Sequence, residues 1–130
     1  MNAFSSRELV RLTRTGGITG DTTQVTVSAS GRVRITRRSG RRTTRLTAEE
    51  LARLRCALQA AKLDRLPSQD QPPSPDMFEY VLAVRGRRVR LVDVPLSSVA
   101  VLTLVGFLAQ LADEQDGMPR AVELPPCPQR

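Results

Sequence analysis

Short runs of alternating apolar and polar residues predict β-strands in the first third of the chain. The runs cover residues 9–13, where the strand is predicted to end at Thr15-Gly16-Gly17, and residues 24–28, 32–36 and 43–46. In each of the first three runs every second residue is apolar, which is the pattern of a strand with one buried face. Ser30-Gly31 is typical of the turn of a β-hairpin, and Ser39-Gly40 interrupts the chain before the fourth run.

A helix start follows directly. Thr47 is suited to cap the helix, since its hydroxyl can accept from the Glu50 amide while the Glu50 carboxylate reaches back. Leu46 and Leu51 flank this cap as a hydrophobic staple. Apolar residues then recur at helical spacing, which predicts a helix over about residues 48–63.

The second half of the chain predicts another hairpin and another helix. Residues 67–75 contain four prolines and are expected to form an exposed loop. Alternation resumes from Phe78 to Val94 around a turn at Gly86, and apolar residues cover nearly every face of a predicted helix over residues 97–113.

These elements together predict an α+β fold. An antiparallel sheet from two hairpins plus an N-terminal strand would pack against the two helices, within one domain over residues 1–113. Residues 114–130 contain four prolines and few apolar residues, and we expect a flexible Pro-rich C-terminal tail there.

Composition argues against an enzyme. The chain has no histidine, so it lacks the commonest general acid/base and the commonest metal ligand. Cys56 and Cys127 are too few and too far apart to predict a zinc site or a disulfide framework. We expect Cys56 to be a small buried apolar residue and Cys127 an exposed thiol, with no catalytic residue, no metal and no cofactor.

The sequence predicts no segment that would direct the protein to or through a membrane. Charged residues interrupt the first ten positions before an apolar signal segment forms, and no run of about 18 apolar residues occurs. The sequence therefore predicts a cytoplasmic protein without a membrane partner. We also expect the free protein to be a monomer.

Arginine supplies almost all of the positive charge, with nineteen arginines, one lysine and a net charge of +7. Seven arginines fall between Arg32 and Arg45, and a second group surrounds the predicted turn between Arg85 and Arg90. Such faces can bind nucleic acid or an acidic protein. They can equally be solvated strand faces that discourage edge pairing.

The stretch from Thr15 to Asp21 is different in kind, because it contains three glycines in five residues. Glycine at this density indicates backbone torsions with positive φ or a close approach by another backbone. Ile18 is the apolar residue in its midst. It either folds inward onto the core or is displayed to a partner.

The order of these motifs resembles the emfourin family of small bacterial proteins. The family's Arg-Ser-Gly-Gly-aromatic-Ala-Gly pattern is matched by Arg14-Thr15-Gly16-Gly17-Ile18-Thr19-Gly20, where Ile18 stands in the aromatic position. A second match runs from Asp76 through Phe78 and Tyr80. Alternation assigns Phe78 and Tyr80 to the core. The resemblance covers about four-fifths of the chain, from Leu9 to Leu111.

Emfourins inhibit thermolysin-like (M4) zinc metalloproteases, so the resemblance implies a protein inhibitor that blocks the active-site cleft by protein–protein contact. It implies no cofactor, a thermolysin-like metalloprotease as partner and a contact surface that includes Arg14, Thr15, Gly16, Gly17, Ile18, Thr19 and Gly20. An apolar side chain on a glycine-framed loop suits such a cleft, because these proteases cleave before bulky apolar residues.

Overall fold

Six antiparallel strands form one sheet in the computed structural model, which describes residues 7–16, 21–61, 78–84, 87–92, 99–113 and 123–127. The strands are β1 (Glu8–Gly16), β2 (Asp21–Ser28), β3 (Arg32–Arg37), β4 (Gly40–Arg45), β5 (Phe78–Val84) and β6 (Arg87–Val92). Their order across the sheet is β4-β3-β2-β1-β5-β6, so β1 lies inside the sheet and joins the first four strands to the last two.

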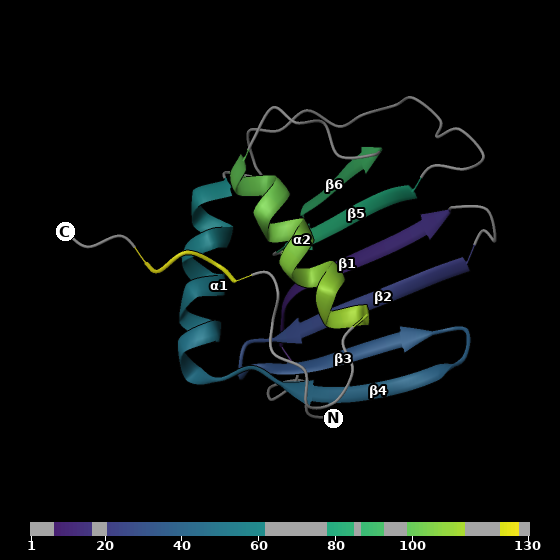
Figure 1. Ribbon diagram of the computed structural model, residues 1–130, viewed down its shortest axis with the longest axis horizontal. Helices are drawn as coiled ribbons and strands as arrows, with labels where there is room; N and C mark the ends of the chain where they lie inside the picture. The colour runs from purple at the N-terminus through teal and green to yellow at the C-terminus, as the bar shows by residue number, and fades with distance from the viewer. Residues whose placement is uncertain are drawn as a thin grey trace.

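Two helices, α1 (Ala48–Ala61) and α2 (Val99–Asp113), cover one face of the sheet, and no described helix or strand covers the other, which we call the open face (Figure 1). The core lies between these layers. Leu12 of β1 is flanked by Val25 and Leu82 on the neighbouring strands, and all three are at most 2% exposed. Leu54 of α1 is fully buried in the same apolar cluster.

The start of α1 has the predicted capping box. The Glu50 amide donates to the Thr47 hydroxyl at 3.1 Å, and the Thr47 amide donates to the Glu50 carboxylate at 3.0 Å. The turn between β2 and β3 is also as predicted, since Gly31 has a φ of 93° and its amide donates to the Ser28 carbonyl. This turn is tied to the helix start because the Leu46 amide donates to the Gly31 carbonyl at 2.9 Å.

Helix α2 is the more deeply packed of the two, with seven buried residues that include Phe107. It contacts α1 on one side and strands β1 and β2 below. Its 15 residues span only about 22 Å at 1.5 Å per residue. Neither described helix combines the length and apolarity needed to cross a bilayer.

The predicted α+β fold is confirmed, with differences at the strand ends. β1 begins at Glu8, one residue before the predicted alternation, and runs to Gly16, in agreement with the predicted end at Thr15-Gly16-Gly17; it pairs with β2 and β5 at once. β4 begins at Gly40 itself, where a φ of 141° lets the chain reverse. The predicted ends of the helices at residues 62–63 and 97–98 lie outside the described residues, as does the turn at Gly86.

The prediction for the two cysteines is wrong, because Cys56 and Cys127 form a disulfide with Cα atoms 5.5 Å apart. Leu124 is 3% exposed, and its carbonyl accepts from the Arg53 guanidinium at 3.2 Å. Residues 123–127 therefore pack on α1, although the sequence places them in a flexible tail. The cysteines are 71 residues apart in the sequence, so the fold and not their spacing brings them together.

Replacing both cysteines by serine is expected to lower the free energy of unfolding by about 2–4 kcal/mol, because the disulfide restricts the unfolded chain. Urea titrations of the oxidised protein and the double variant would measure the difference. Dithiothreitol should destabilise the wild type to the same extent and leave the variant unchanged. Two alkylatable thiols in the unreduced, unfolded wild type would contradict the disulfide.

Candidate partner-binding surfaces

The glycine-rich turn lies between the two strands β1 and β2 of the sheet interior. Gly16 and Asp21 are cross-strand partners at the last described step of the β1–β2 ladder, and Gly16 has a φ of 118°. That torsion is strained for any residue with a side chain. Thr15 lies opposite Thr22, with their hydroxyl oxygens 3.3 Å apart. The other predicted contact residues Gly17, Ile18, Thr19 and Gly20 lie outside the described residues.

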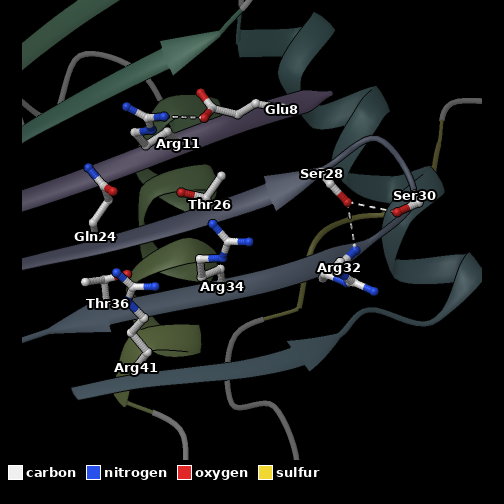
Figure 2. Close-up of a pocket in the computed structure, with 10 residues that line it drawn as sticks. All are labelled: Glu8, Arg11, Gln24, Thr26, Ser28, Ser30, Arg32, Arg34, Thr36 and Arg41. Carbon is white, nitrogen blue, oxygen red and sulfur yellow. Dashed lines mark hydrogen bonds and ion pairs between the residues drawn. The ribbon is translucent and has the colours of Figure 1, made fainter. Parts of the chain in front are cut away.

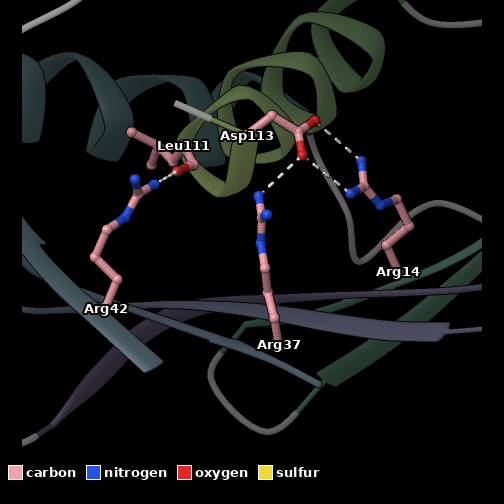
Figure 3. A network of polar contacts seen from close by, with 5 residues as sticks. All are labelled: Arg14, Arg37, Arg42, Leu111 and Asp113. Atoms are coloured by element: carbon pink, nitrogen blue, oxygen red, sulfur yellow. Dashed lines mark hydrogen bonds and ion pairs between the residues drawn. The ribbon is translucent and has the colours of Figure 1, made fainter. Parts of the chain in front are cut away.

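Arg14, also predicted to contact a partner, points to the helix side of the sheet (Figure 3). Its guanidinium donates to the Asp113 carboxylate at 3.3 and 3.4 Å. Arg37 donates to the same carboxylate at 3.1 Å, and Arg42 donates to the Leu111 carbonyl at 2.9 Å. Three arginines thus meet the C-terminal end of α2, where the helix dipole favours positive charge.

This arginine cluster around Asp113 borders a hollow of about 450 Å³ beside the glycine-rich turn. Gly16, Asp21, Arg38 and Ser39 line the hollow as well. The Arg14 side chain is 20% exposed, so part of its surface faces this hollow while its charge is shared with Asp113. The structure therefore gives Arg14 a definite role in docking α2 on the sheet beside the predicted contact surface.

A second polar surface covers the open face of the sheet. Its hollow of about 710 Å³ has Gln24, Thr26 and Ser28 of β2 along the middle (Figure 2). Arginines stand on both sides of this row: Arg11 on β1, and Arg32, Arg34 and Arg41 on β3 and β4. Glu8 is an acidic residue of the lining and pairs with Arg11 at 2.5 Å.

The structure divides the arginine stretch 32–45 between the two faces. Arg32, Arg34, Arg41 and Arg45 alternate with buried or half-buried residues and face the open side, whereas Arg37 and Arg42 face α2. Arg88 and Arg90 of β6 join the open face, because Val89 between them is buried. The two arginine groups that are separate in the sequence therefore lie on one sheet.

Sequence reasoning missed the cluster around Asp113, although a signal was present. Alternation places Arg14 two residues after the buried Leu12 and Arg37 two residues after the buried Ile35. An arginine on the core side of a strand requires a partner, and a helix C-terminus can supply one. The missing information was which helix end would lie above these strands.

No cluster of three or more potential metal ligands occurs among the residues that the structure describes. No protein-family model, curated protein or solved structure matches the chain. The surfaces are therefore interpreted from their own chemistry.

Replacing Asp113 by alanine is expected to destabilise the protein by about 0.5–1 kcal/mol, because partly exposed ion pairs contribute little individually. This loss of stability should be smaller at high salt, because salt screens the ion pairs. Thermal unfolding at low and high ionic strength would measure it.

Arg38→Ala provides the matched control, since Arg38 pairs with Asp21 at 3.3 Å but its side chain is 84% exposed. Its removal should leave stability nearly unchanged. Equal losses in the two variants would contradict a docking role for Asp113.

Proposed function

We propose that this protein inhibits a thermolysin-like (M4) zinc metalloprotease by blocking its active-site cleft through protein–protein contact. The observation that carries the proposal is the placement of the glycine-rich turn. It joins β1 and β2, both internal strands of the sheet, and its first glycine, Gly16, has a positive φ. The emfourin-like pattern over Arg14 to Gly20 supplies the class of partner.

The anchoring of the turn favours such a role. β1 pairs with β2 through Gly16 and Asp21, and it pairs with β5 through Gly16 and Phe78. Arg14, directly before the turn, donates to the Asp113 carboxylate. A loop whose ends are fixed in this way loses less conformational entropy when it binds, which raises its affinity for a cleft.

The mode of inhibition follows from the residue types at the turn. The predicted contact residues from Arg14 to Gly20 include no histidine, cysteine or carboxylate that would ligate zinc. Ile18 would instead fill an apolar pocket of the protease, while the backbone pairs with a strand at the edge of the cleft. No cofactor takes part in this mode of binding.

The disulfide bears on where the encounter takes place. Disulfides persist in oxidising compartments and are rare in the cytosol of mesophiles. The Cys56–Cys127 bridge thus favours a meeting with the protease in an oxidising compartment over the cytoplasmic location expected from the sequence. Trapping the thiols with an alkylating agent in intact cells would distinguish the two.

Titration of an M4 protease with the purified protein tests the function. We expect the hydrolysis of a peptide substrate to fall with increasing inhibitor, and zinc to remain bound to the protease. Full activity at a large molar excess, against both thermolysin and a protease encoded beside this protein, would reject the proposal.

Ile18→Ala is expected to weaken inhibition at least tenfold while shifting the melting temperature little, because the truncation removes about 1.5–3 kcal/mol of apolar burial only in the complex. Inhibition constants and thermal unfolding of the variant would be measured together. Leu12→Ala, which truncates a buried core residue, serves as the control that lowers stability. A comparable loss of stability in Ile18→Ala would assign Ile18 to the core instead.

A further inference from the structure

The open face of the sheet has a large surplus of positive charge. Register and alternation place seven arginines on it: Arg11, Arg32, Arg34, Arg41, Arg45, Arg88 and Arg90. Two glutamates share the face, and each is paired, Glu8 with Arg11 and Glu79 with Arg90. Among the described residues the surplus is therefore five positive charges, which attract an anionic partner.

The arrangement of these charges is linear. The hollow follows β2, whose side chains on this face are uncharged hydroxyls and an amide, and arginines of β1 and β3 stand on either side. β1 and β3 are two strand spacings apart, which is about 10 Å. The eight residues of β2 extend about 26 Å at 3.3 Å per residue. A chain of anionic groups fits this shape better than a compact anion.

The chemistry of the face favours phosphates over the carboxylates of a protein partner. Protein interfaces depend on buried aromatic and apolar anchors. None of the described side chains on this face is aromatic, and the apolar ones are the half-buried Val81 and Ala83 on β5, outside the hollow. Arginine, threonine, serine and glutamine are the side chains that contact nucleic-acid backbones.

We propose that the open face binds single-stranded nucleic acid along β2 through its phosphates, without base preference. Arg11 on one side and Arg32, Arg34 and Arg41 on the other pair with the backbone, while Gln24 and Thr26 offer hydrogen bonds from the floor. The major groove of a DNA duplex alone is about 12 Å wide, so a whole duplex is too wide for this hollow. This surface is distinct from the glycine-rich turn and is independent of protease inhibition.

Fluorescence anisotropy with a labelled single strand of about 20 nucleotides tests the proposal, since single-strand sites usually span fewer nucleotides than this. With these four arginine–phosphate contacts, affinity should fall about 50-fold between about 50 and 200 mM salt, because each contact adds about 0.7 to the logarithmic slope. Two strands of different base composition should bind alike, and a duplex should bind more weakly.

The double variant Arg32→Gln/Arg34→Gln should bind more weakly and lose only about 7-fold over the same salt range, since two of the four contacts are removed. Both side chains are exposed, so the fold should persist, as circular dichroism would verify. Arg38→Gln/Arg55→Gln removes the same charge from exposed positions outside the hollow and should retain the wild-type slope. Inhibition of the protease should be unchanged in Arg32→Gln/Arg34→Gln.

Four outcomes would overturn the proposal: no anisotropy change at the lowest salt, equal weakening in both double variants, tighter binding of the duplex, or displacement by polyglutamate at lower concentration than by unlabelled single strand. The last would assign the face to an acidic protein. Failure of this experiment would leave the inhibitor titration unaffected, because the two surfaces are separate.

Discussion

The pairing of β1 on both of its edges is the interaction on which the rest of the structure depends. Leu12 lies between Val25 and Leu82, and the second of these partners is about 70 residues away in the sequence. The sheet, and with it the surface that α1 and α2 cover, is continuous only once this distant pairing is made. The cost of closing so long a loop is offset by burying a row of aliphatic side chains, each contributing about 1.5–3 kcal/mol.

The same strand supplies both candidate surfaces, because successive side chains of a strand point to opposite faces. Arg11 stands beside the hollow on the open face, and Arg14 reaches the end of α2 on the other. The two arginines have different surroundings as a result. One is part of a face with surplus charge, and the other shares a carboxylate with Arg37 and helps to hold the helix.

Local features were predictable from the sequence, and features that depend on distant contacts were not. The Thr47 capping box and the Gly31 turn involve residues within four positions of one another, so their patterns determine their structures. Alternation also assigned the buried faces of the strands correctly. It did not indicate the order of the strands, because a period of two is the same in every antiparallel arrangement.

The main features that were not predicted depend on contacts between residues far apart in the sequence. The Cys56–Cys127 bridge and the Asp113 cluster each join residues at least 69 positions apart. Spacing along the chain gave no indication that the last residues return to α1. The arginine stretch 32–45 was recognised as a basic segment, but its division between two faces required the register of β3 and β4. The described part of the glycine-rich turn shows its anchoring at Gly16, and the contact role of the turn stays a prediction.

The disulfide determines what a single cut in the backbone does to the molecule. A single cut in the backbone anywhere between Cys56 and Cys127 produces two fragments that remain covalently joined, because the bridge spans the break. Where the cut falls between Cys56 and Phe78, the β1–β5 ladder also holds the two fragments together. The fragments of a nicked chain therefore stay linked, and the β1–β2 ladder beside the glycine-rich turn lies wholly within the N-terminal fragment.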